Sequence, residues 1–125
     1  KDTKAYQNWE LRNLKRKCLR LWSSKVRGLV GNKCVMCGSG ESLHSHHLED
    51  NRLCSALRYD IRNGVCLCAR HHKYCMDAAH KSFTIMYKYM SENRPNDIDY
   101  LLSNRFNKVV WSKELLLHRI EELDG

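Results

Sequence analysis

The sequence lacks the features of a membrane or secreted protein. No apolar run approaches the roughly 20 residues that a membrane-spanning helix requires, and the first four residues, Lys1-Asp2-Thr3-Lys4, are charged and unlike a signal peptide. The sequence contains neither an internal repeat nor a low-complexity tract. Because it does not begin with Met, it can be a piece of a longer chain. We therefore expect a soluble chain whose 125 residues form one domain.

The seven cysteines are also not an even set, which the disulfide framework of a small secreted protein usually requires. Reduced thiols and a bound metal fit this count better, and both are typical of a reducing compartment. We therefore expect a cytoplasmic protein. Cys18, Cys54 and Cys66 are expected to be small buried apolar residues.

Two pairs of soft metal ligands stand at the two ends of residues 34–71. Cys34 and Cys37 are separated by two residues, and so are Cys68 and His71. This spacing lets both side chains of a pair reach one tetrahedral Zn²⁺ from a tight turn. The pattern predicts a structural zinc site. The surrounding stretch holds more histidine than such a site needs, which suggests chemistry.

The net charge of +8 is confined to the first quarter of the chain. Residues 1–33 hold ten of the 22 basic residues and two of the 14 acidic ones. A local basic block indicates a polyanionic partner, most often nucleic acid, because Lys and Arg release counterions condensed on phosphates. The alternative is a basic helix face that is merely solvated. The residues expected to contact phosphate here are Arg12, Lys15, Arg16 and Arg20.

Apolar periodicity places the expected elements around this stretch. A helix is predicted over residues 4–22, ending at Ser23-Ser24, with an apolar stripe that packs on the zinc module. Short strands are predicted over residues 43–48 and 64–68 as an antiparallel pair. Further helices are predicted from 78 to 89, capped by Asp77, from 98 to about 106, and from 112 to 123. Residues predicted to face inward in the last three helices are Phe83, Met86, Tyr87, Met90, Leu115, Leu116, Ile120 and Leu123.

The ordered motifs of this stretch resemble the zinc-containing branch of the HNH endonuclease family, particularly its phage-encoded members. The motifs are Cys-x-x-Cys-Gly, Leu-x-x-His-His-Leu, Leu-Arg-Tyr-Asp-x-Arg-Asn-Gly-Val-x-Leu-Cys-x-x-His-His and Ala-His-Lys, within residues 34–82. The resemblance implies an α+β protein with a ββα-metal core over 34–82. A basic helical arm over 1–33 and a helical packing extension over 83–125 would flank it. It also implies a host cytoplasm if a phage encodes the chain.

The resemblance also implies roles for single residues. His47 matches the family's general base, and Asn63 matches the residue that holds the loop orienting this base. The ligands implied for the catalytic ion are His46, His72 and His80, although His80 is almost equally well explained as a surface residue. The ligands implied for the structural zinc are Cys34, Cys37, Cys68 and His71. A Cys is commoner than His at position 71, so Cys75 is an alternative fourth ligand.

The implied activity is metal-dependent hydrolysis of DNA phosphodiester bonds, by nicking or cutting. Imidazole has a pKa of about 6.5, so it can take a proton from water at neutral pH. Two or three imidazoles completed by water can bind Mg²⁺, Mn²⁺, Zn²⁺ or Ni²⁺. We expect Mg²⁺ or Mn²⁺ as the catalytic ion. His46 and His47 are neighbours and would point to opposite faces of a regular strand. Both can act only if the strand bends or the phosphate lies between them.

Two further functions fit the sequence. A non-catalytic zinc-stabilised DNA-binding module, in a phage recombination or packaging complex, explains the basic block but not the surplus of histidines. A zinc module for protein partners fits the charge least well. Further Arg residues are candidate phosphate contacts, although Arg58 could instead pair with Asp60 or Glu49; these candidates are Arg52, Arg58 and Arg70.

Overall fold

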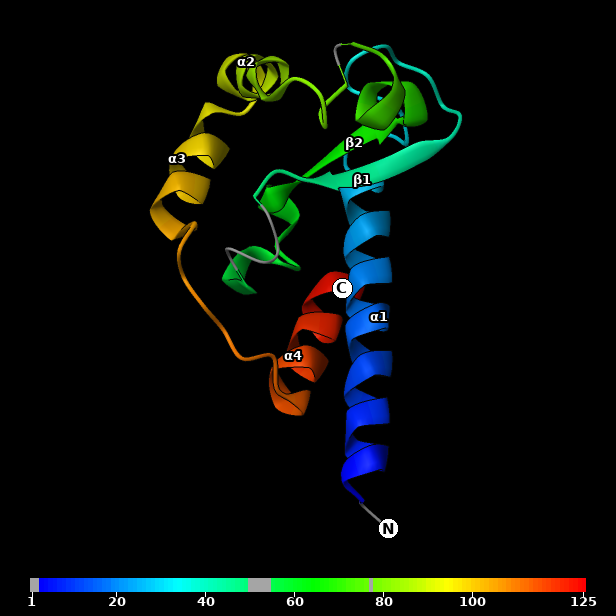
Figure 1. The fold of residues 1–125 in the computed structure, drawn as a ribbon, viewed down its shortest axis with the longest axis vertical. Helices are drawn as coiled ribbons and strands as arrows, with labels where there is room; N and C mark the ends of the chain where they lie inside the picture. The colour runs from blue at the N-terminus through cyan, green and yellow to red at the C-terminus, as the bar shows by residue number, and fades with distance from the viewer. Residues whose placement is uncertain (1–2, 50–54, 77) are drawn as a thin grey trace.

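The computed structural model describes residues 3–49, 55–76 and 78–125. Within these ranges, helices combine with one two-stranded antiparallel sheet, so the predicted α+β class is confirmed. Figure 1 shows the sheet lying across one end of the long first helix, with the last helix beside that helix and the two middle helices to one side. Among the described residues, no helix has both the length and the apolar character needed to cross a bilayer.

Helix α1 (Lys4–Gly28) continues through Ser23-Ser24, so the predicted end at these serines is wrong. The apolar stripe carries on beyond them, because Trp22 and Val26 lie one turn apart and are both buried. The Ser23 hydroxyl accepts a hydrogen bond from the Arg27 guanidinium within the helix. Burial of the stripe therefore outweighs the weak helix propensity of two serines.

The prediction that the apolar stripe of α1 packs on the zinc module is mostly wrong. Its buried residue Cys18 packs with Trp111 and with Leu116 of α4 (Lys113–Asp124), and Leu11, Leu14 and Leu21 border the same cluster. Only the end of α1 reaches the sheet. The helix is thus held along most of its length by the C-terminus of the chain, which Figure 1 shows beside it.

Strands β1 (Leu43–His47) and β2 (Gly64–Cys68) pair antiparallel, as predicted. Leu43 is opposite Cys68 and His47 is opposite Gly64. A methyl group on Gly64 would lie 2.5 Å from Val26 and 2.8 Å from Trp22. The lack of a side chain at Gly64 therefore lets the end of α1 lie directly against the sheet.

Two short 3₁₀ turns, Ser55–Leu57 and Ile61–Asn63, order the connection between the strands. Leu57 and Tyr59 are buried there. Arg52 and Cys54 lie outside the described residues. After β2 the chain forms one wide helical turn, the π-helix Arg70–Tyr74, closed by a hydrogen bond from the amide of Cys75 to the carbonyl of Arg70. This turn stands where the ββα-metal pattern predicts a helix.

Helix α2 (Phe83–Asn93) begins five residues after the predicted start, because residues 78–81 form a turn with Ala78 and Ala79 buried. Asp77, the predicted cap, lies outside the described residues. Helix α3 (Pro95–Asn104) begins at Pro95, three residues before the predicted start. Proline suits the first helical turn, where its missing N–H is not needed. The break between the two helices lies at Arg94.

Not every predicted inward residue is buried. Met86 and Met90 of α2 are buried, but Phe83 is 79% exposed and Tyr87 is 56% exposed. In α4, Leu116, Ile120 and Leu123 are buried whereas Leu115 is exposed. Each helix buries a narrower stripe than its apolar residues allow, and on α2 this leaves two aromatic rings uncovered.

Candidate metal centres and the adjoining cavity

Cys34, Cys37, Cys68 and His71 come together in one cluster, called here the sulfur cluster. Its four potential ligand atoms lie within 4.8 Å of one another. Among the described residues, His71 belongs to this cluster and the alternative ligand Cys75 does not. The turn after Cys34 is closed by a hydrogen bond from the amide of Gly38 to the carbonyl of Cys34, and Gly38 has φ +78°, which favours glycine.

The distances in the sulfur cluster match those of a tetrahedral zinc site. The Sγ atoms of Cys37 and Cys68 are 3.8 Å apart, and Nδ1 of His71 lies 3.8 Å from Sγ of Cys34 and 3.3 Å from Sγ of Cys68. Ligands on one Zn²⁺ at its usual bond lengths would be about 3.8 Å apart for two sulfurs and about 3.6 Å for sulfur and nitrogen. The cluster is therefore consistent with a structural zinc, with all four positions taken by protein.

The surroundings of Cys68 in the sulfur cluster favour its thiolate over its thiol, and the thiolate is the form that binds a metal. Burial alone would raise the pKa of Cys68, but hydrogen bonds from the backbone and side chain of His71, together with Cys37 and Cys34, outweigh it and lower this pKa to about 6. Metal binding requires the deprotonated sulfur. Cys68 thus loses its proton at neutral pH.

A second cluster, called here the imidazole trio, consists of His46, His72 and His80. His46 comes from β1 and His72 from the π-turn. Nε2 of His80 lies 2.9 Å from Nε2 of His72. Two nitrogens bound to one ion at about 2.1 Å, at a right angle, would be about 3.0 Å apart. The trio has the ligand type and spacing to hold a divalent ion.

The backbone explains why His80 joins the trio despite lying outside any strand or helix. The amide of Ala79 donates to the carbonyl of His71 at 2.7 Å, and the amide of His80 donates to the carbonyl of His72 at 3.2 Å. This short ladder aligns residues 79–80 with residues 71–72. Consecutive residues of the π-turn then serve different clusters, with His71 facing sulfur and His72 facing imidazole.

Two members of the imidazole trio, His46 and His72, are held in the neutral form that binds a metal. Burial lowers the pKa of His46 to about 3, and the neighbouring His72, His80 and His47 lower it further in the same direction. Burial, together with His80, His44 and Lys73, lowers the pKa of His72 to about 4. At neutral pH both rings therefore keep a lone pair for an ion.

His44, to which the sequence assigns no role, contacts the trio from behind. Its Nδ1 lies 2.8 Å from Nδ1 of His72, on the opposite edge of that ring from His80. A proton shared between these Nδ1 atoms leaves Nε2 of His72 as the ligand atom, and a hydrogen bond of this kind commonly orients a metal-bound histidine. The i, i+2 spacing of His44 and His46 on one strand is a signal that places both on the same face.

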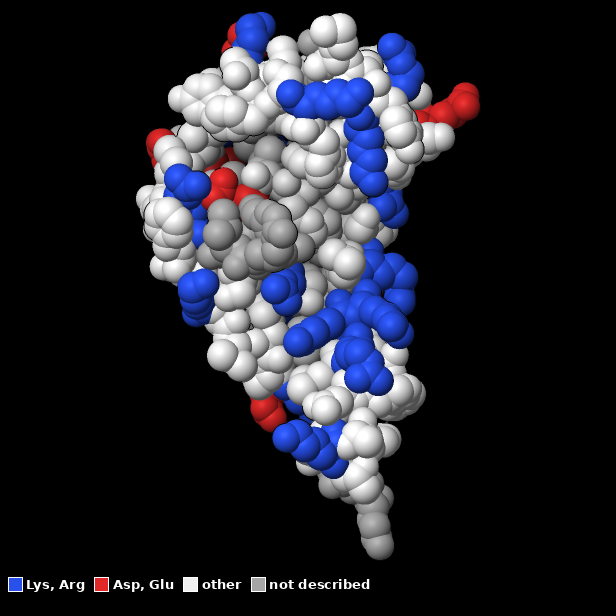
Figure 2. Space-filling view, in the orientation of Figure 1, with Lys and Arg blue, Asp and Glu red and all other residues white. Residues whose placement is uncertain are grey.

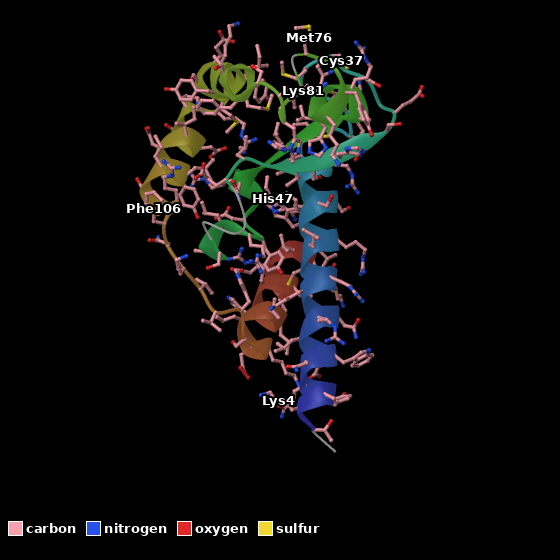
Figure 3. The ribbon with its side chains drawn as sticks, viewed as in Figure 1. Lys4, Cys37, His47, Met76, Lys81 and Phe106 are labelled. Carbon is pink, nitrogen blue, oxygen red and sulfur yellow. The ribbon has the colours of Figure 1, made fainter. Side chains whose placement is uncertain are left out.

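His47 is fixed by a stack and a hydrogen bond. Its ring lies on that of Trp22, with centroids 3.9 Å apart and an angle of 5° between the planes. Its Nε2 is 2.9 Å from the carbonyl oxygen of Arg58. Because a carbonyl only accepts, Nε2 carries the proton and, in the neutral ring, Nδ1 carries the lone pair. Figure 3 shows His47 beside the sheet end of α1, with Cys37 at the opposite end of the hairpin.

Asn63 has no exposed surface and holds the loop around His47. Its Oδ1 accepts from the amide of Glu49 at 2.7 Å, and its Nδ2 donates to the carbonyls of Glu49 and Leu57. Leu57 directly precedes Arg58, whose carbonyl binds His47. Asn63 therefore ties both ends of the loop together. The carbonyl of Arg58 fixes the tautomer of His47.

A cavity of about 1020 Å³ adjoins the imidazole trio, and all three of its histidines line it together with His47. Although His46 and His47 are neighbours, both reach this space, because β1 ends at His47. The opposite side, called here the α2–α3 wall, is apolar. It consists of Phe83, Met86, Tyr87, Ile98, Leu101 and Leu102.

The predicted phosphate contacts lie in different surroundings. Arg12, Arg16 and Arg20 are exposed on α1 and Lys15 is half-buried, and Figure 2 shows Lys and Arg gathered along this helix. Arg70 is exposed on the π-turn, whereas Arg58 is half-buried beside the loop of His47. Arg52 lies outside the described residues.

No protein-family model matches this chain, and no curated protein or solved structure matches it significantly.

Proposed function

We propose that this protein is a metal-dependent DNA endonuclease of the HNH type, with His47 as general base. The observation that carries the proposal is the meeting of the imidazole trio and an oriented fourth imidazole at one cavity. A purely structural or DNA-binding module needs the sulfur cluster but has no use for these four rings. The exposed basic residues of α1 supply a surface for a DNA backbone.

The residues present fit a hydrolytic role for a divalent ion. His46, His72 and His80 would hold it, and it would supply positive charge where negative charge develops on the phosphate and on the leaving oxygen. His47 takes the proton of the attacking water at Nδ1. The carbonyl oxygen of Arg58 accepts the hydrogen bond from Nε2, and this hydrogen bond becomes stronger as the ring gains positive charge. Asn63 keeps the carbonyl of Arg58 in place.

The test is nicking of supercoiled plasmid by the zinc-loaded protein and by His47→Ala, each with added Mg²⁺ or Mn²⁺ and with EDTA. We expect nicking that requires the added ion, and a loss of at least about a hundredfold in His47→Ala, the low end for loss of a general base. The variant should still bind DNA and one zinc. Equal nicking by both proteins would contradict the role of His47.

A non-catalytic DNA-binding module is the second candidate. The exposed basic face of α1 favours it, because this face does not line the cavity and could bind DNA without any reaction there. It predicts salt-dependent DNA binding, with affinity falling steeply as salt rises, and no nicking under any ion. Affinity that does not change with salt would exclude both candidates.

A further inference from the structure

We propose that the α2–α3 wall stacks on an unpaired nucleobase, so that the substrate is single-stranded or locally unpaired DNA. The inference rests on the proposed function for the identity of the polymer. The inference goes beyond the proposed function because it assigns a base-binding subsite to an apolar and aromatic surface that the hydrolysis itself does not use. The observation that carries it is a pair of uncovered aromatic rings in the same cavity as the imidazole trio.

The two rings are presented to solvent rather than left over from packing. Phe83 and Tyr87 lie one turn apart on α2, so their side chains lie on the same face of that helix. Both line the cavity although they are 79% and 56% exposed, and Met86 and Met90 already fill the buried side of the helix. Phosphodiester hydrolysis alone needs no aromatic surface there.

The cavity as a whole has the mixed character of a nucleotide. One side offers imidazoles and Lys73 for a phosphate, while the other offers aromatic and aliphatic surface for a base. Arg105 also lines the cavity, where its Nε pairs with the Glu49 carboxylate at 3.1 Å. An anionic ligand with a flat apolar part satisfies both sides, whereas an apolar peptide would leave the imidazole side without a partner.

Hydrogen bonds and ion pairs also fix the position of the α2–α3 wall relative to the side of the cavity that holds the imidazole trio. Arg94, between the two helices, donates to the carbonyls of Gly64 at 2.8 Å and Arg62 at 3.1 Å, at the start of β2. Asp97 of α3 pairs with Arg94 and Arg62. A base on this wall would therefore lie at a fixed offset from the imidazole trio, as positioning of a neighbouring phosphate requires.

Unpaired DNA is favoured over a regular duplex. In a duplex both faces of each base are covered by its neighbours, so a side wall can stack on a base only after that base leaves the helix. Stacking on an aromatic side chain is available to every base and is the usual mode of single-strand binding. The predicted preference is therefore for single strands, whatever their sequence.

The test measures binding separately from cleavage. Zinc-loaded protein without added Mg²⁺ is titrated into a labelled single-stranded oligonucleotide and into the corresponding duplex, and affinity is read by fluorescence anisotropy. A second oligonucleotide carries 2-aminopurine, whose fluorescence falls when the base stacks. The variants are Phe83→Ala, Tyr87→Ala, Phe83→Leu and Phe83→Trp. The matched control is Tyr74→Ala, because Tyr74 is 69% exposed but does not line the cavity.

We expect each of Phe83→Ala, Tyr87→Ala and Phe83→Leu to weaken single-strand binding about fivefold or more and to leave duplex binding within about twofold. Phe83→Trp and Tyr74→Ala should bind as wild type, and quenching of 2-aminopurine should be lost only in the weakened variants. Unchanged single-strand affinity in both alanine variants would overturn the proposal, and so would equal weakening on duplex. Failure of wild type, with added Mg²⁺ or Mn²⁺, to cleave both supercoiled plasmid and the single-stranded oligonucleotide contradicts the endonuclease instead, since the binding measurements need no cleavage.

Discussion

The sulfur cluster and the imidazole trio share one hairpin and one turn, yet they differ in the number of their ligands, in the presence of sulfur and in access to the cavity. The sulfur cluster has four ligands, of which Cys34 and Cys68 are buried, and it lines no part of the cavity beside the trio. The trio has three ligands and opens on a cavity of about 1020 Å³. Closed tetrahedral sites stabilise folds, while sites with an open position bind water or substrate. The proposed function thus assigns stability to the sulfur cluster and reactivity to the trio.

The largest expected effect is loss of a sulfur ligand. Cys34→Ala should remove the zinc and abolish the cooperative melting of the hairpin, because apparent zinc binding energies of small structural sites are about 10 to 16 kcal/mol. Zinc content and thermal unfolding by circular dichroism measure both effects. Cys75→Ala is the matched control and should keep its zinc. A Cys34→Ala protein with full zinc content would show that the sulfur cluster does not hold the ion.

The neighbours His71 and His72 allow the sharpest comparison of the two clusters. His72→Ala should lower nicking by at least about a hundredfold, since losing a ligand should cost at least as much as losing a residue that orients one, while melting and structural zinc stay as in wild type. His71→Ala should instead lower the melting temperature and the zinc content. If His72→Ala loses its structural zinc, the two clusters are not independent.

A smaller effect is expected behind the trio, at His44. His44→Phe should weaken binding of the added divalent ion by about tenfold to a hundredfold, because His72 loses the partner that orients it. Titration of the ion by isothermal calorimetry measures this, and zinc at the sulfur cluster should not change. His44→Gln can still hydrogen-bond to His72 and should recover part of the affinity. Identical ion affinity in His44→Phe would contradict the orienting role.

The smallest effect concerns the attachment of the α2–α3 wall rather than either cluster. Burial would raise the pKa of Asp97, but hydrogen bonds from Arg94 and Arg62 outweigh it and lower that pKa. A lowered carboxylate pKa stabilises the fold above the unfolded value of about 3.9, and this contribution is lost as pH falls below it.

Asp97→Asn should therefore lower the free energy of unfolding by about 1 to 3 kcal/mol at neutral pH. The free energy of unfolding of this variant should also decrease less than that of wild type as the pH falls into the acidic range. Chemical denaturation at neutral and acidic pH measures both. Asp99, an exposed residue of the same helix, gives the control variant Asp99→Asn, which should match wild type. Parallel acid profiles for wild type and Asp97→Asn would contradict the assignment.

Ligand spacing and strand patterns could be read from the sequence because they are local. Two residues between Cys34 and Cys37, and between Cys68 and His71, already restrict both pairs to tight turns. The hairpin followed from alternating residues and flanking turn signals. The predicted end of α1 was wrong because burial of Val26, which depends on the distant Gly64, decided how far that helix extends.

The tertiary structure decided how these local pieces meet. The Ala-His-Lys motif pointed to His80 only through the family resemblance, whereas the ladder between residues 79–80 and 71–72, which brings His80 to the trio, depends on tertiary structure. The role of His44 and the uncovered rings of Phe83 and Tyr87 likewise depend on which neighbours pack against each element. Sequence determined which ligand pairs can bind a metal, since that depends on chain geometry over a few residues. Only long-range packing decided which cluster is closed and which opens on a cavity.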